Sequence, residues 1–234
     1  MSNKAKGIFF DAGDTLFQVK EGVGVQYSRF AKKYGIDVAP DLLNQRFREV
    51  FKRSPPLAFP GLSGAALKAR EKEWWYRIVR AVFDDIRFPK FDPLFEEIFH
   101  FFRGAEGWVL FPDTKETLDR LSKEGYPLGI ISNFDSRIEE VCSALGIRRY
   151  FQTVTISSQE GVAKPSPEIF KKALKKAGLL PTESLYIGDS PDHDIKGAQE
   201  IGMKVLLLDR TGRYPNERAV PRISSLQALA DHLW

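Results

Sequence analysis

From about residue 108 onward, short apolar runs alternate with segments that carry helix signals, and this alternation limits the chain to few folds. The apolar runs are residues 128–132, 153–156, 185–187 and 205–208. Continuous runs of this kind are typical of strands buried on both faces. The helical segments between them are residues 113–124, 137–145 and 167–177, and each stops at a glycine. Such alternation with short connections predicts an α/β fold with a Rossmann-like parallel sheet and helices on both faces.

The first predicted strand, residues 7–10, is followed by a long stretch with a different pattern, which has helical segments and no convincing strand. These segments are residues 23–34, 41–51, 67–86 and 93–102. A Pro- and Gly-rich break at residues 54–64 separates them into two helical hairpins. We therefore expect two parts, an α/β core of residues 1–17 and 108–234 and an all-helical cap of residues 18–107 inserted into it.

The composition is that of an ordinary globular chain, and its net charge of +4 is spread along the sequence. No basic, aromatic-rich module or zinc-ligand spacing points to nucleic acid. Cys142 is the single cysteine, so no intramolecular disulfide forms, and its helical spacing with apolar neighbours predicts a buried, inert thiol. No apolar stretch has the length of a membrane span and no signal-peptide pattern begins the chain. We expect a cytoplasmic monomer or homodimer that binds no membrane.

Polar side chains follow the predicted strands at the points where the strands end. They are Asp11 and Asp14, Ser132 and Asn133, Lys164, and Asp189 and Asp194. In an open parallel sheet, ligands bind beyond the carboxyl ends of the strands. We therefore expect these side chains to gather at one edge of the sheet.

The residue types at this edge favour hydrolysis of an anionic substrate. A carboxylate such as Asp11 can attack phosphorus or an activated carbon when its target is made electrophilic. Asp11 and Asp189 can together hold Mg²⁺, which prefers oxygen ligands and screens the repulsion between two anions. Ser132 can donate a hydrogen bond to a phosphoryl oxygen, and Lys164 can neutralise charge that develops in the transition state.

Taken in order, these motifs resemble the haloacid dehalogenase (HAD) superfamily over nearly the whole chain. The resemblance rests on the DxxxTL segment that begins at Asp11, on the helical insertion, and on the strings IISN, KPSPEIF and GDSPDHD. Within the superfamily, IISNFDSR followed by AKPSPEIF is similar to the haloacid dehalogenase-like hydrolase domain-containing protein 3 group. The resemblance implies a Mg²⁺-dependent hydrolase with a helical cap of the first type, and we expect its substrate to be a small phosphate monoester.

The resemblance also implies a role for each residue that matches a motif. Asp11 would be the nucleophile that forms an aspartyl-phosphate. Ser132 would bind the transferring phosphoryl group and Lys164 would neutralise its charge. Asn133 would either contact the substrate or hold a turn.

For the metal, the resemblance implies a ligand set of oxygen atoms. Asp11, Asp189 and the backbone carbonyl of Gly13 would bind Mg²⁺. Asp194 fits the second acidic position of the last motif, either as a further metal ligand or as an anchor for Lys164 and for metal-bound water.

Gly13 departs from the pattern of the family's phosphatases, D-x-D-G-T, in which the second aspartate is the general acid that protonates the leaving group. Glycine cannot transfer a proton, and loss of such a group typically costs about 10²–10⁴-fold in rate. Asp14, one residue later, either substitutes as the acid or forms a local turn. The departure also leaves open a binding module that keeps the phosphate and metal pocket without efficient catalysis.

A 2-haloacid dehalogenase is the main enzymatic alternative, because attack on carbon needs no leaving-group proton. The resemblance would then require a cap arginine to hold the halide or carboxylate, and Arg46 and Arg48 are the candidates. Asp189 favours the metal-dependent hydrolase, because dehalogenases of this kind do not use Mg²⁺ and resemble SSN rather than GDS at this motif.

Overall fold

The computed structural model describes residues 5–88, 90–217 and 219–233. Its main sheet has six parallel strands in the order β5-β4-β1-β6-β7-β8. The strands are β1 (Gly7–Phe10), β4 (Leu128–Ser132), β5 (Phe151–Ile156), β6 (Ser184–Gly188), β7 (Lys204–Leu208) and β8 (Arg222–Ile223). The predicted α/β fold is confirmed, and each predicted strand coincides with an observed strand or lies inside one.

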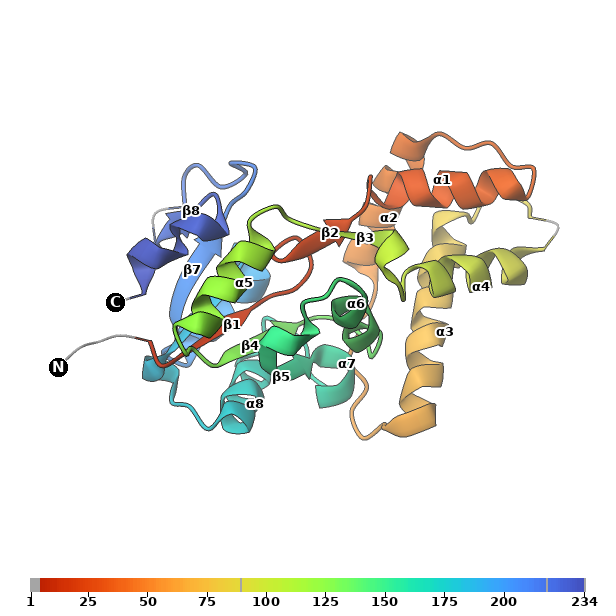
Figure 1. Cartoon of the computed structure of the whole chain (residues 1–234). Helices are drawn as coiled ribbons and strands as arrows, with labels where there is room; N and C mark the ends of the chain where they lie inside the picture. The colour runs from red at the N-terminus through yellow and green to blue at the C-terminus, as the bar shows by residue number, and fades with distance from the viewer. Residues whose placement is uncertain (1–4, 89, 218, 234) are drawn as a thin grey trace.

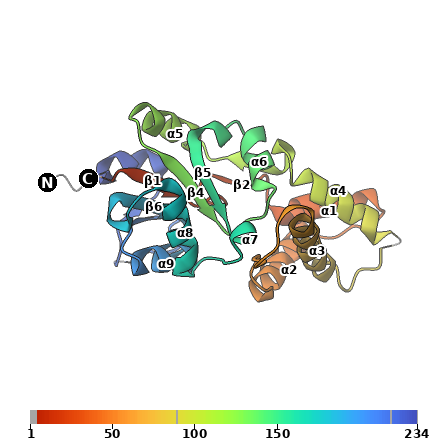
Figure 2. The ribbon, with the colours of Figure 1, turned by 90° about the horizontal axis from the view of Figure 1, so that it is seen from below.

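Helices cover both faces of this sheet, because successive residues of a strand point to opposite sides. In β1, Ile8 and Phe10 pack in one apolar core with α5 (Thr114–Lys123) and α6 (Ile138–Ala144). Phe9 packs in a second core with α8 (Pro167–Ala177) and α9 (Lys196–Glu200) on the other face (Figure 2). Cys142 is buried in the first core, and burial raises the pKa of its thiol to about 12, as an inert thiol requires. The remaining helical segments are η1 (Ala105–Gly107), η2 (Arg148–Tyr150), α7 (Ser157–Glu160), η3 (Pro181–Glu183), η4 (Pro191–Ile195) and η5 (Leu226–His232).

The predicted cap region forms a helical lobe beside the sheet, on the side toward which β1 runs (Figure 1). Aromatic and aliphatic side chains of this lobe, including Tyr27, Trp74 and Phe83, share a core of their own. Its helices are α1 (Val23–Lys33), α2 (Pro40–Arg53), α3 (Gly64–Val82) and α4 (Phe91–Phe101). The third is shorter at its end than the predicted 67–86, because the chain leaves the helix after Val82 and turns, with the N–H of Ile86 donating to Phe83 O at 3.0 Å.

A short antiparallel ribbon connects the helical lobe to the sheet. In it β2 (Phe17–Val19) pairs with β3 (Trp108–Leu110). The prediction of no strand within residues 18–107 is wrong here, because residues 18 and 19 belong to β2. Strands of three residues that are only partly buried give too short a pattern to detect. The predicted core also included residues 1–4, 218 and 234, which lie outside the described residues.

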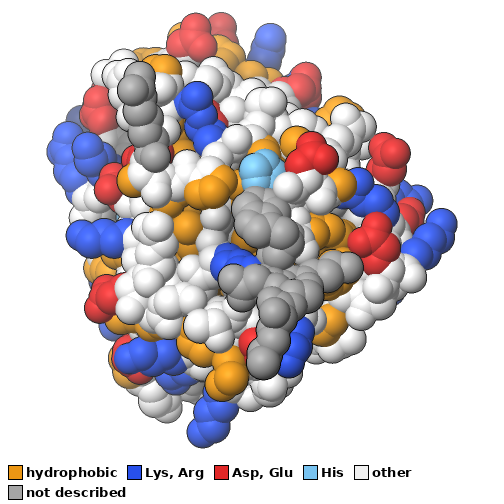
Figure 3. All heavy atoms as spheres, turned by 90° about the vertical axis from the view of Figure 1, so that its left-hand side faces the viewer, with side chains coloured by type: hydrophobic (Ala, Val, Ile, Leu, Met, Phe, Trp, Pro, Cys, Tyr) orange, Lys and Arg blue, Asp and Glu red, His pale blue; other side chains and the backbone are white. Residues whose placement is uncertain are grey.

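The end of the molecule that lies away from the helical lobe has basic and acidic side chains interspersed (Figure 3). This agrees with a charge that is spread along the chain. Among the residues described, no helix is both long enough and apolar enough to cross a bilayer.

Candidate active site

The candidate residues meet where the strand order reverses. Because β1 lies between β4 and β6, Asp11 at the end of β1 has Ser132 of β4 on one side and Asp189 after β6 on the other. The N–H of Asp11 donates to Ile187 O at 2.8 Å, which extends the pairing of β1 with β6 by one residue. Doubly wound sheets bind ligands at this reversal point. The topology therefore brings the predicted residues to one sheet edge.

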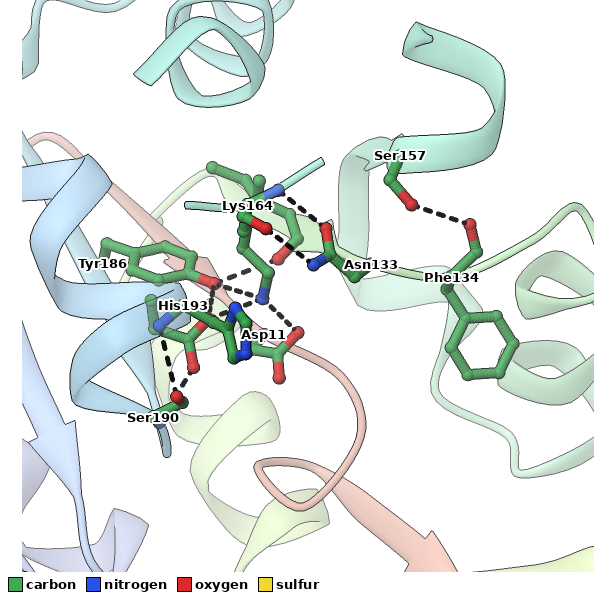
Figure 4. A network of polar contacts seen from close by, with 10 residues as sticks. Asp11, Asn133, Phe134, Ser157, Lys164, Tyr186, Ser190 and His193 are labelled. Atoms are coloured by element: carbon green, nitrogen blue, oxygen red, sulfur yellow. Dashed lines mark hydrogen bonds and ion pairs between the residues drawn. The ribbon is translucent and has the colours of Figure 1, made fainter. Parts of the chain in front are cut away.

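Lys164 reaches this edge from the loop before α8 and is held at both its side chain and its backbone (Figure 4). Its ammonium nitrogen lies 2.7 Å from Asp11 Oδ1 and 2.5 Å from Asp194 Oδ1. Burial alone would lower the pKa of Lys164, but the two carboxylates outweigh that effect and raise it, so the side chain carries a positive charge. The amide of Asn133 accepts a hydrogen bond from Lys164 N at 2.8 Å and donates to Lys164 O at 3.0 Å. Asn133 therefore positions Lys164.

Three carboxylates form an acidic cluster around this lysine. Oxygen atoms of Asp11, Asp189 and Asp194 all lie within 4.8 Å of one another. Burial, together with the charges of Asp11 and Asp194, raises the pKa of Asp189 to about 8. Lys164 and Arg213, whose Nη2 lies 3.2 Å from Asp189 Oδ2, are two cations for three carboxylates, and an all-oxygen donor set suits a hard divalent cation. The residues present therefore fit Mg²⁺.

Asp194 is engaged by the protein at both carboxylate oxygens. Its Oδ1 accepts from Lys164 and from the Tyr186 hydroxyl at 2.8 Å, and its Oδ2 accepts from Ser190 N at 3.0 Å. The carboxyl group packs against Gly188, where a Cβ would lie 2.4 Å from Asp194 Cγ, so only glycine allows this approach. Of the two roles expected for Asp194, these contacts favour the anchor of Lys164.

The family model of haloacid dehalogenase-like hydrolases matches residues 5–202 of this chain. The chain belongs to that family. Haloacid dehalogenase-like hydrolase domain-containing protein 3 of Bos taurus is 31% identical over 235 residues, which are 96% of this chain and 93% of that protein. The expected resemblance to the domain-containing protein 3 group is thus confirmed.

Other similar HAD proteins carry the names of different activities. Glyceraldehyde 3-phosphate phosphatase of Methanopyrus kandleri is 39% identical over 105 residues, which are 44% of this chain and 45% of that protein. The crystal structure of 2-haloacid dehalogenase from Pseudomonas syringae pv. Tomato DC3000 is 24% identical, covers 97% of both chains and has a TM-score of 0.68. The HAD fold is therefore shared by both chemistries, and the site residues must decide between them.

At the position of the missing general acid, this hydrolase has open space. A Cβ added to Gly13 would meet no atom within 4 Å. Asp14 is exposed and has a left-handed φ of 56°, and its N–H donates to Phe17 O at 2.8 Å. These features are those of a turn residue, the plainer of the two roles expected for Asp14.

The two cap arginines expected for a dehalogenase are engaged within the helical lobe. Arg46 forms a bidentate ion pair with Asp85 at 2.5 and 2.6 Å. Arg48 is exposed, and its Nε donates to the carbonyl of Asn44 on the same helix at 3.3 Å. Neither contact leads toward Asp11.

Sequence reasoning missed the side chains that reach the site or its loops from other elements. Tyr186 of β6 contacts both Lys164 and Asp194. Arg213, in the loop after β7, lies 3.2 Å from Asp189 Oδ2. The indole of Trp75 donates to Asp135 Oδ2 at 2.5 Å and so ties α3 to the loop that follows Ser132. Of these residues, only Tyr186 stood out in the sequence, because it places a polar group in an otherwise apolar strand.

Proposed function

We propose that this HAD hydrolase uses Mg²⁺ to cleave small phosphate monoesters through an aspartyl-phosphate on Asp11. The observation that carries the proposal is the charge arrangement, in which Lys164 joins Asp11 to Asp194 while Asp189 completes an acidic cluster around them. A nucleophilic carboxylate held by a fixed ammonium beside a cation site suits transfer of a dianionic group.

The proposed ligands of Mg²⁺ are Asp11, Asp189 and the carbonyl of Gly13. When bound, the ion supplies charge screening between the nucleophile and the phosphate and orients both. Burial raises the pKa of Asp11 and Lys164 opposes this rise. A cation at the cluster favours the ionised carboxylate further, which is the form that attacks phosphorus.

In the proposed reaction, an oxygen of Asp11 attacks phosphorus in line with the ester oxygen. The phosphorus–oxygen bond to the leaving group breaks, and the alkoxide takes its proton from solvent because Gly13 has none to give. Lys164 and Ser132 hold the transferring oxygens. Water then attacks the aspartyl-phosphate, which releases inorganic phosphate and restores the Asp11 carboxylate.

Three observations support phosphate over a haloacid. A relative at 39% identity, over a little under half of this chain, is a glyceraldehyde 3-phosphate phosphatase. The cap arginines that a dehalogenase would need are occupied by contacts within the lobe. The raised pKa of Asp189 points to a cation, whereas attack on a haloacid in this family requires none.

The test is hydrolysis of p-nitrophenyl phosphate with and without Mg²⁺, by the unaltered protein and by Asp11→Asn. We expect Mg²⁺-dependent release of p-nitrophenol that Asp11→Asn abolishes. Asp37→Asn, at an exposed position of the helical lobe, is the control and should keep full activity.

Absence of hydrolysis by the unaltered protein would contradict the proposal. In that case, chloride release from 2-chloropropionate would identify a dehalogenase. Failure of both assays, with Mg²⁺ and phosphate still bound in calorimetry, would identify a binding module.

A further inference from the structure

Tyr186 places a hydroxyl group inside the charged network of the site. The residue lies in β6 and is fully buried. Its ring packs edge-on against Phe170 of α8, with the ring centroids 5.1 Å apart. A phenylalanine would make the same apolar contact, so packing alone does not account for the hydroxyl.

The hydroxyl completes the hydrogen bonding of Lys164 (Figure 4). An ammonium group has three hydrogens to donate. Lys164 Nζ has three acceptors, which are Asp11 Oδ1 at 2.7 Å, Asp194 Oδ1 at 2.5 Å and the Tyr186 hydroxyl at 3.1 Å. With all three present, the ammonium cannot rotate without losing a bond.

The remaining contacts of the Tyr186 hydroxyl also lie at the site. Its oxygen is 2.8 Å from Asp194 Oδ1 and 3.0 Å from the carbonyl of Ile131, the residue before Ser132. The hydroxyl therefore links β4, β6, the Lys164 loop and the η4 turn through a single buried atom.

We propose that Tyr186 is a positioning residue, whose hydroxyl fixes the Lys164 ammonium and the Asp194 carboxylate so that one lysine N–H points at Asp11. The inference rests on the proposed function and deepens it, because it assigns the orientation of the Lys164 ammonium to a residue outside the family motifs matched above. Tyr186 acts through Lys164 and does not touch the substrate.

The test compares Tyr186→Phe with Tyr150→Phe in hydrolysis of p-nitrophenyl phosphate. Tyr150 is a matched control, because its hydroxyl donates to Asp119 at 2.5 Å and accepts from Arg149 at 2.8 Å, next to the start of β5 and at the opposite end of that strand from the site. Both variants lose a hydroxyl that contacts one carboxylate and one cation, but the Tyr150 hydroxyl is only partly buried. Tyr150→Phe therefore controls for the loss of such a hydroxyl away from the site.

For Tyr186→Phe we expect kcat to fall by about 10- to 100-fold, since a buried donor such as the Lys164 ammonium costs about 1–3 kcal/mol when it is misoriented or lacks an acceptor. The KM should stay within about threefold, because interactions that form only in the transition state change kcat. Inhibition by orthovanadate, which mimics the five-coordinate transition state, should weaken by the same factor as kcat, while inhibition by inorganic phosphate should not. Tyr150→Phe should change none of these values.

Equal kinetics for the two variants would overturn the inference while leaving the phosphatase proposal intact. A second measurement does not depend on activity: NMR of the lysine ammonium groups in ¹⁵N-labelled protein. The unaltered protein and Tyr150→Phe should show one slowly exchanging ammonium signal from Lys164, and Tyr186→Phe should lose it. If that signal persists in Tyr186→Phe, the hydroxyl does not hold the lysine, whatever reaction the protein catalyses.

Discussion

Replacing Gly13 with aspartate would restore a general acid beside the nucleophile, and the structure allows a quantitative expectation. The space around a Cβ at Gly13 is free to 4 Å, and the backbone lies outside the left-handed region, so the Cβ of the new residue enters without strain. A positioned acid contributes about 10²–10⁴-fold when the leaving group needs a proton. No neighbouring residue has been selected to orient this one, so we expect the lower end, about 10²-fold.

The assay is the ratio of rates on two substrates with different leaving groups. Glycerol 2-phosphate has an alkoxide leaving group that needs a proton, and its kcat/KM should rise by about 10²-fold in Gly13→Asp. p-Nitrophenolate leaves without protonation, so the rate on p-nitrophenyl phosphate should change by less than about threefold. Gly13→Asn, which has the same shape and no acidic proton, is the control and should show no gain.

Equal gains on both substrates would refute the reasoning, because they would mean that the aspartate acts on metal or substrate binding. An equal gain in Gly13→Asn would also refute it. No gain on either substrate would show that an acid placed at Gly13 does not reach the leaving oxygen.

Three further predictions concern Asp189, the packing of Gly188 against Asp194, and the Asp135–Arg137 ion pair. The pKa of Asp189 is raised to about 8 in the metal-free folded protein, so between about pH 5 and 8 the folded protein holds a proton that the unfolded chain has lost. The stability of the metal-free protein should therefore fall as the pH rises over this range. Thermal unfolding in EDTA should show this decline, and saturating Mg²⁺ should abolish it. Gly188→Ala should lower kcat by at least about tenfold, because the new Cβ would displace Asp194 and so change the position of the Lys164 ammonium. A kcat equal to that of the unaltered protein would contradict the packing argument. Asp135→Ala should cost about 3–5 kcal/mol in urea unfolding, because it leaves the buried Arg137 without its carboxylate partner; a loss below about 1 kcal/mol would mean that water reaches that guanidinium.

Local pattern predicted the elements of the sheet well. The run 7–10 is the whole of β1, and the helix that begins at Pro167 after Ser166 ends at Ala177, before the left-handed Gly178, as its capping residues indicate. Both predictions succeed because burial on both faces and capping chemistry act over a few neighbouring residues. The rule that parallel strands present their carboxyl ends at one edge then predicted which side chains would meet.

Short or irregular elements were less predictable. The strands β2 and β3 have three residues each and β8 has two, so none of them has a repeat long enough to detect. The pairing of β2 with β3 depends on how the lobe and the sheet bring residue 17 beside residue 110.

The sequence by itself determined the α/β class, the inserted helical region and the candidate residues Asp11, Ser132, Lys164 and Asp189, because each follows from periodicity or from a motif along the chain. Only the tertiary structure decided that Lys164 contacts Asp11 across 153 positions, that Arg46 pairs with Asp85, and that Tyr186 completes the lysine's hydrogen bonds. The physical reason is that a side chain's partners depend on which elements pack together, and the spacing of residues along the chain does not specify them.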